Sequence, residues 1–139
     1  MYLLEHLHDI NNFYSKILRS IGSQNNLTFE QSKLLIAIPF DGISLSDLAS
    51  NLGIDNSTLT RNIQKLKEKN KIKINFDCYD KRKKILSLSN NGMQTLKIIE
   101  NNICTVLEKL NEYLDVDDIQ KIQSSLEKLN WSLSCLNNE

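Results

Sequence analysis

Apolar residues near both ends of the chain recur at alternating intervals of three and four positions, the spacing of one face of an α-helix. This pattern predicts helices over residues 2–21, over 92–114 and from 117 to 136. Gly22 is expected to end the first of these helices, and Asp117 to cap the last. Each helix would carry a continuous apolar face like that of a coiled coil. A single 139-residue domain with one small core has little need for three such faces. We therefore expect a dimer in which the terminal helices of two copies interlock. The alternative is an intramolecular bundle packed on the central segment.

The middle of the chain predicts two short helices separated by a tight turn. Ser44 is suited to cap a helix that ends at Asn51, because its hydroxyl can accept a hydrogen bond from a first-turn amide. Gly53 then provides a turn that a residue with a Cβ would resist. Asp55 caps the second helix, and Asn70 ends it in the left-handed conformation. The arrangement is typical of a helix-turn-helix.

Two further elements are expected ahead of this pair. Thr28 and Gln31 have the spacing of a capping box and predict the start of a helix. Pro39 and Gly42 interrupt the chain after that helix. Ile43 is expected to add a short strand beside the hairpin that follows the helix-turn-helix.

Alternation of apolar and polar residues after the second helix predicts a β-hairpin. Ile72, Ile74 and Phe76 alternate with polar residues on the first strand, and residues 85–88 continue the pattern on the second. The charged loop between them, residues 77–84, holds four consecutive basic residues. Two strands joined by such a loop directly after a recognition helix form a wing, whose tip can follow a phosphate backbone or enter a minor groove.

The exposed face of the second helix has the side chains of a DNA-reading surface. Short hydroxyls lie near its start, and an arginine and a glutamine suited to bidentate base contacts follow. The alternative is an ordinary amphipathic helix with a polar outer face. The residues expected to contact base edges or nearby phosphates are Ser57, Thr58, Thr60, Arg61 and Gln64.

Charge is distributed unevenly, although the chain as a whole is neutral. Residues 61–84 contain ten of the 17 basic residues and three acidic ones, a net charge of +7, and the remainder is therefore −7. A basic module in an otherwise acidic chain is typical of a nucleic-acid-binding protein. From Lys65, Lys81 and Lys83 we expect contacts to the DNA backbone. We expect replacement of Lys71 by alanine mostly to lower the salt dependence of binding.

The segments at residues 46–70 and 77–89 resemble the MarR family of winged-helix transcription regulators. In that family an aspartate two residues before a wing arginine orients it into the minor groove, and Asp80 and Arg82 occupy these positions. The resemblance also implies dimerisation through terminal helices and a small-molecule effector, for which no residues are assigned. Two departures, Asn56 where the family often has proline and Asn70 where it often has glycine, suit their positions physically.

Other classes of function find little support in the sequence. His6 and His8 point to different faces of a helix, so we expect neither a catalytic base nor a metal site, and no cofactor. No apolar run is long enough to span a membrane, no signal peptide is recognised, and the few scattered cysteines fit the cytoplasm. Cys78 lies beside basic residues that would favour its thiolate form. A thiol-based redox sensor using Cys78 or Cys104 is therefore one alternative, and a winged-helix adaptor that binds protein instead of DNA is another.

The sequence predicts a mainly α protein with a winged helix-turn-helix and a small β-wing, flanked by N- and C-terminal dimerisation helices. We expect a single domain over residues 1–139, with the winged helix at 28–89 and dimerisation helices at 2–21 and 92–137. The expected function is that of a homodimeric repressor that binds a pseudo-palindromic operator in double-stranded DNA and is relieved by an effector. No enzymatic activity is expected.

Overall fold

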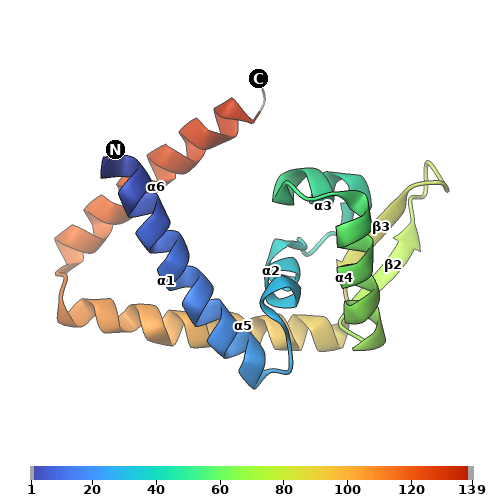
Figure 1. The fold of residues 1–139 in the computed structure, drawn as a ribbon, viewed down its shortest axis with the longest axis horizontal. Helices are drawn as coiled ribbons and strands as arrows, with labels where there is room; N and C mark the ends of the chain where they lie inside the picture. The colour runs from blue at the N-terminus through green and yellow to red at the C-terminus, as the bar shows by residue number, and fades with distance from the viewer. Residues whose placement is uncertain (1, 138–139) are drawn as a thin grey trace. The chain divides into compact units, whose positions relative to one another are not determined.

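The computed structural model describes residues 2–137. The chain divides after Ile103 into two compact units. The first unit contains helix α1 (Tyr2–Gln24), helix α2 (Phe29–Ala37), strand β1 (Ile43–Ser44), helix α3 (Leu45–Leu52), helix α4 (Asn56–Glu68), strands β2 (Ile72–Phe76) and β3 (Lys84–Leu88), and most of helix α5 (Asn90–Glu108). The second unit contains the last turn of α5, a 3₁₀ turn η1 (Lys109–Glu112) and helix α6 (Val116–Leu136) (Figure 1). The predicted mainly α fold with a small β-wing is confirmed.

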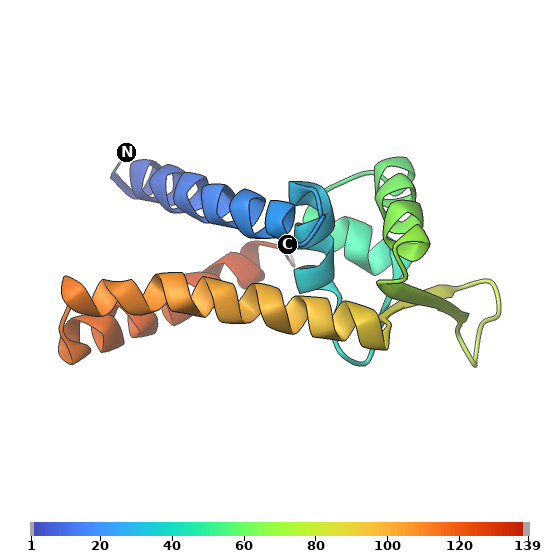
Figure 2. The ribbon, with the colours of Figure 1, turned by 90° about the horizontal axis from the view of Figure 1, so that it is seen from below.

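The three strands form one antiparallel sheet in the order β1-β3-β2. The predicted third strand is therefore present, with Ile43 opposite Leu86. In the hairpin, Ile74 also lies opposite Leu86, and Ile72 lies opposite Leu88. Figure 2 shows the hairpin projecting beyond the helices as a wing, with its loop at the far end.

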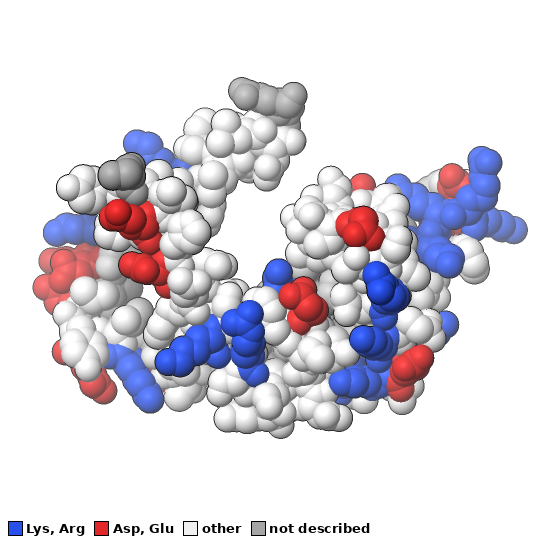
Figure 3. All heavy atoms as spheres, in the orientation of Figure 1, with Lys and Arg blue, Asp and Glu red and all other residues white. Residues whose placement is uncertain are grey.

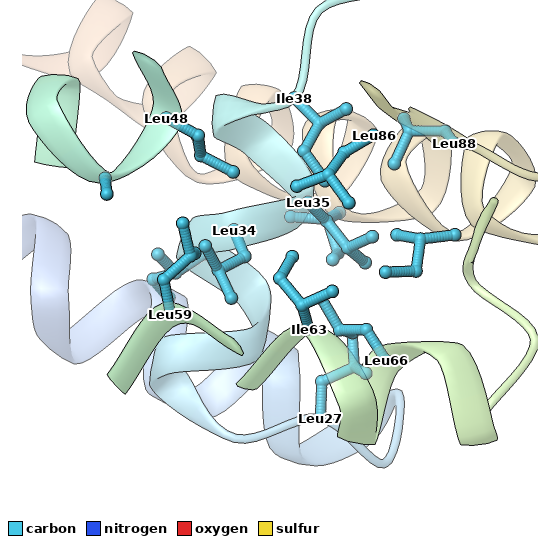
Figure 4. Close-up of a cluster of buried hydrophobic side chains, with 14 of the residues drawn as sticks. Leu27, Leu34, Leu35, Ile38, Leu48, Leu59, Ile63, Leu66, Leu86 and Leu88 are labelled. Carbon is cyan, nitrogen blue, oxygen red and sulfur yellow. The ribbon is translucent and has the colours of Figure 1, made fainter. Parts of the chain in front are cut away.

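The core of the first unit lies where α2, α3 and α4 meet the sheet. The inward residues of α4 are Leu59, Ile63 and Leu66, and all three are buried. They pack with Leu34 and Leu35 of α2 and with residues of the sheet (Figure 4). The three positions on α4 are four and three residues apart, so burial of one face holds α4 in place and leaves the opposite face free.

Three predicted helix boundaries were wrong. The helix predicted over residues 92–114 ends at Glu108, where the 3₁₀ turn η1 follows. Helix α1 does not end before Gly22 but continues to Gln24. Gly22 is buried inside it, and a Cβ there would overlap the hydroxyl of Ser32 on α2. The glycine therefore permits close helix packing. The last helix is capped by Asp115, whose side chain accepts from the amide of Asp118, and not by Asp117.

The second unit differs from the first in having no buried side chain among its described residues. Helix α6 nevertheless carries an apolar residue every three or four positions. Large apolar side chains such as Leu126 and Trp131 are exposed, the latter by 69%. The prediction of one domain over residues 1–139 stays a prediction.

Candidate nucleic-acid interface

Capping interactions fix both ends of the turn between α3 and α4. Ser44 Oγ accepts a hydrogen bond from the amide of Asp47 at 3.1 Å, which opens α3. Gly53 ends α3 in the left-handed conformation, with φ +64°. At the start of α4, Asp55 Oδ1 accepts from the amide of Thr58 at 2.8 Å. Ser44, Gly53 and Asp55 thus have the capping and turning roles that the sequence predicted for them.

The carboxylate of Asp55 also accepts a hydrogen bond from the hydroxyl of Thr58, at 2.8 Å. The amide of Thr58, followed by its hydroxyl, lowers the pKa of Asp55 below its ordinary value. A carboxylate at this end of a helix also interacts favourably with the helix dipole. Asp55 is therefore ionised whenever the helix is formed near neutral pH.

The outer face of α4 presents most of the side chains that were predicted to contact DNA. Ser57, Thr60, Arg61, Gln64 and Lys65 are all exposed. Some of their hydrogen-bonding capacity is used within the helix. The hydroxyl of Thr60 donates to the carbonyl of Asn56 at 2.7 Å, and Gln64 Nε2 lies 3.4 Å from an oxygen of Glu68.

Thr58 differs from these residues in being half-buried. Its amide and its hydroxyl both donate to Asp55. Only the lone pairs of its hydroxyl oxygen remain available to a partner, so Thr58 could accept a hydrogen bond but not donate one while the cap is intact.

The wing loop is closed by hydrogen bonds across its base and within its tip. The amide of Asp77 donates to the carbonyl of Lys83 at 2.9 Å, and the amide of Lys83 donates to the carbonyl of Asp80 at 2.9 Å. Asp77 Oδ1 in turn accepts from the amide of Tyr79 at 2.7 Å. The basic residues at the tip are thus carried by a folded turn.

Asp80 and Arg82 lie together at the tip of the wing. Asp80 Oδ1 accepts from the amide of Arg82 at 3.0 Å and lies 3.5 Å from its Nε. The arginine side chain is 95% exposed. An ion pair this exposed contributes little to stability. The pair instead restrains the orientation of the Arg82 side chain. The Asp80 carboxylate contacts the guanidinium at Nε and leaves the two terminal nitrogens of Arg82 available to another partner.

A groove of about 460 Å³ separates the wing from the start of the helix-turn-helix. Its walls include Ser46 at the start of α3 and Asn56, the first residue of α4, opposite Asp80, Arg82 and Lys84. Ser46, Asn56 and Lys84 were not among the predicted site residues. Their positions in the first turns of two helices and at the base of a wing could have identified them, because helix N-termini attract phosphate.

Basic side chains gather over the wing and along α4 (Figure 3). Lys81, Arg82 and Lys83 are all exposed at the tip. Lys71 differs from these residues. Its Nζ lies 2.9 Å from Asn91 Oδ1 and 2.9 Å from Thr95 Oγ1, both on α5. The expectation that Lys71 supplies general electrostatic attraction to DNA is therefore not supported by its position.

Residues 2–137 contain no cluster of three or more potential metal ligands, and none of their helices is both long and apolar enough to span a bilayer. Cys78, Cys104 and Cys135 are free and exposed.

Comparisons with known proteins agree with this geometry. A family model described as winged helix-turn-helix DNA-binding matches residues 41–73. The chain is 21% identical over 140 residues to the HTH-type transcriptional regulator TcaR of Staphylococcus aureus, a match that covers 99% of this chain and 92% of TcaR.

Solved structures share the fold across nearly the whole chain. A crystal structure of MarR superposes with a TM-score of 0.85 at 20% identity, over 98% of this chain and 93% of that one. A mutant MarR from E. coli in complex with operator DNA superposes with a TM-score of 0.70 at 22% identity, over 93% and 94% of the two chains. The chain therefore contains a match to a winged helix-turn-helix DNA-binding domain, is similar in sequence to a transcriptional regulator of nearly the same length, and shares the fold of MarR structures.

Proposed function

We propose that the protein is a homodimeric repressor that binds a pseudo-palindromic operator in double-stranded DNA. The observation that carries the proposal is the joint presentation of two DNA-reading elements in one unit. The exposed polar face of α4 is suited to a major groove, and the Asp80–Arg82 pair lies at the tip of a basic wing. One solved structure of the same fold was determined with operator DNA, which supports extending this activity to the present chain.

Each element has a distinct role in this proposal. Helix α4 enters the major groove, where Arg61 and Gln64 contact base edges, and Ser57, Thr58 and Thr60 contact base edges or nearby phosphates. Lys65, Lys81 and Lys83 neutralise phosphates, which positions the protein and makes binding dependent on salt. Arg82 enters the adjacent minor groove while Asp80 restrains its guanidinium.

The exposed apolar side chains of both units support a dimer. On α1, Leu3, Leu4, Ile10 and Phe13 are each more than half exposed. In the second unit, the end of α5 and helix α6 enclose a groove of about 700 Å³ lined by apolar residues. Exposed apolar patches of this extent mark association surfaces. The aliphatic residues of the groove are Leu107, Leu110, Leu114, Ile119, Ile122 and Leu126, and polar and charged residues such as Glu108 and Asn130 also line it.

A two-fold symmetric dimer would place its two recognition helices in half-sites about one helical turn apart. Occupation of such a site in a promoter would block transcription, which is the basis for proposing a repressor that acts in the cytoplasm. A small-molecule effector would relieve repression by binding more tightly to a dimer geometry that does not match the operator.

The test is DNA binding to the region upstream of the protein's own gene, measured as footprinting and as affinity over a range of salt concentrations. The proposal predicts protection of a short inverted repeat, with an affinity that falls steeply with salt. Weak binding that is indifferent to sequence across in vitro selected duplexes as well would contradict it and would favour the adaptor alternative.

A further inference from the structure

Two lysines that follow α4, Lys69 and Lys71, have their ammonium groups bonded to other elements of the first unit. Lys69 Nζ donates to the carbonyl of Asn26 at 2.6 Å and to Gln31 Oε1 at 2.9 Å. Gln31 is buried, and the same oxygen accepts from the amide of Thr28 in the capping box of α2. Lys69 therefore connects the end of the recognition helix to the turn between α1 and α2.

Lys71 makes the second connection, to α5. Its Nζ donates to Asn91 Oδ1 and to Thr95 Oγ1, and Thr95 is buried. Asn70, between the two lysines, has φ +58°, so the chain turns sharply and the lysines reach different helices.

Backbone contacts at the same place reinforce this connection. The amide of Ser89 donates to the carbonyl of Lys71 at 3.0 Å, and the hydroxyl of Ser89 donates to the carbonyl of Asn70 at 2.6 Å. Ser89 Oγ also accepts from the amide of Gly92 at 2.9 Å, which caps α5. A Cβ on Gly92 would overlap the carbonyl of Lys71. The end of α4 and the first turn of α5 are thus in direct contact.

We propose that Lys69 and Lys71 are positioning residues that hold the recognition helix on the α1–α2 turn and on α5, so that α4 moves together with these elements. We call the two lysines with Asn70, Ser89 and Gly92 the lysine joint. The proposal rests on the proposed DNA-binding function. It differs from a phosphate-contact role for the same lysines, which their sequence position within the basic segment would suggest. Hydrogen bonds to a charged ammonium are among the stronger ones in proteins, so their loss should loosen the joint.

The first experiment measures affinity and its salt dependence for Lys69→Met and Lys71→Met on two DNA probes. One probe is a non-specific duplex of about 30 base pairs, and the other is a duplex selected in vitro for binding to the wild-type protein. Lys73→Met is the matched control, because it removes the same charge from an exposed neighbouring position. Lys65→Met is the positive control for a phosphate contact.

The lysine joint predicts that both joint variants keep the wild-type salt slope on the non-specific duplex but bind the selected duplex about tenfold more weakly. Lys65→Met should lower the salt slope by about 0.9. A similar loss of slope in Lys69→Met or Lys71→Met would overturn the proposal, because it would show a direct phosphate contact. An equal loss of affinity on both probes would also overturn it, because partial unfolding affects both probes alike.

The second experiment follows amide hydrogen exchange in the free protein. Lys71→Met is expected to speed exchange at Ser89 and Gly92, whose amides donate within the joint, while Lys73→Met leaves it unchanged. Unchanged exchange in Lys71→Met would overturn the proposal. This measurement needs no DNA, so it tests the joint even if the wild-type protein fails to select a sequence and the proposed function itself is wrong.

Discussion

Thr58 supplies Asp55 with two hydrogen bonds, one from its amide and one from its hydroxyl, each 2.8 Å long. The pair closes the first turn of α4, the helix whose outer face is proposed to enter the major groove. The same residue thus stabilises the start of the recognition helix and lies where the DNA is expected to pass. Changes at Asp55 should therefore alter the stability of this helix in a way that depends on pH.

Replacement of Asp55 by alanine should lower the melting temperature at pH 7, because the first-turn amides lose their acceptor. The pKa of Asp55 is lowered in the folded state, so its stabilising effect is complete above the ordinary carboxyl pKa and is lost as the pH falls through the lower, folded-state value. The difference in melting temperature between wild type and Asp55→Ala should accordingly shrink below about pH 4. Thermal unfolding followed by circular dichroism over a pH series measures this. Asp55→Asn keeps a neutral capping oxygen and serves as the control. The difference in melting temperature between Asp55→Asn and Asp55→Ala should not change with pH.

Replacement of Gly92 by alanine should destabilise the first unit, although alanine is the better helix former. The added Cβ would overlap the carbonyl of Lys71, and relieving the overlap requires α5 to move. We expect a loss of about 1–3 kcal/mol in the free energy of unfolding, measured by urea denaturation. Gln94→Ala, at an exposed position of the same helix, should change stability little. A Gly92→Ala protein more stable than the wild type would show that α5 does not pack against the carbonyl of Lys71 as described.

Replacement of Leu126 by lysine should weaken the proposed dimer. Leu126 lies in the apolar groove between the end of α5 and α6, and a buried unpaired charge at an association surface is unfavourable. We expect the dimer dissociation constant to rise at least about tenfold, as measured by sedimentation equilibrium. Ser125→Lys adds the same charge one position away from the groove, where the wild-type side chain is exposed, and should leave association intact. Equal association of both variants would place the dimer interface elsewhere.

The cysteines provide a test of the redox alternative. Cys78, Cys104 and Cys135 are all exposed in the single chain, and Cys78 and Cys135 lie outside the groove proposed as the dimer interface, so peroxide can reach them. In our account a non-thiol effector relieves repression. A variant with all three cysteines replaced by serine should therefore bind DNA with the affinity of the wild type. After mild oxidation, neither protein should lose more than about twofold in DNA affinity. Loss of DNA binding on oxidation of the wild type, but not of this variant, would instead support a thiol sensor. Single replacement of Cys78 would then identify whether the wing cysteine is responsible.

The local signals in the sequence predicted most of the winged helix. Ser44, Gly53, Asp55 and Asn70 each perform the capping or turning role that their chemistry suggests, because these interactions depend only on neighbouring residues. The strand pairing also followed from alternation. Such features are encoded within a few positions of one another.

Most of the features that were not predicted depend on contacts between residues far apart in the sequence. Gly22 looked like a helix terminator, but its role is to admit Ser32 of the next helix. Lys71 looked like one more surface charge in a basic segment, but its ammonium group lies against α5. Asp115 and Asp117 are equally good capping residues by chemistry, so the spacing alone could not decide between them. In the candidate interface, Ser46 and Asn56 could have been identified from their positions in the first turns of α3 and α4, but their placement opposite the wing depends on the fold.

The central claim is that α4 and the wing bind DNA together, with Arg82 in the minor groove. The most direct test is the affinity of Arg82→Ala for the operator duplex, beside Lys73→Ala, which removes an exposed charge outside the proposed interface. The account predicts a loss of about 1–3 kcal/mol in binding free energy for Arg82→Ala and a much smaller loss for Lys73→Ala. Equal and negligible losses for the two variants would contradict the assignment of the wing to the DNA.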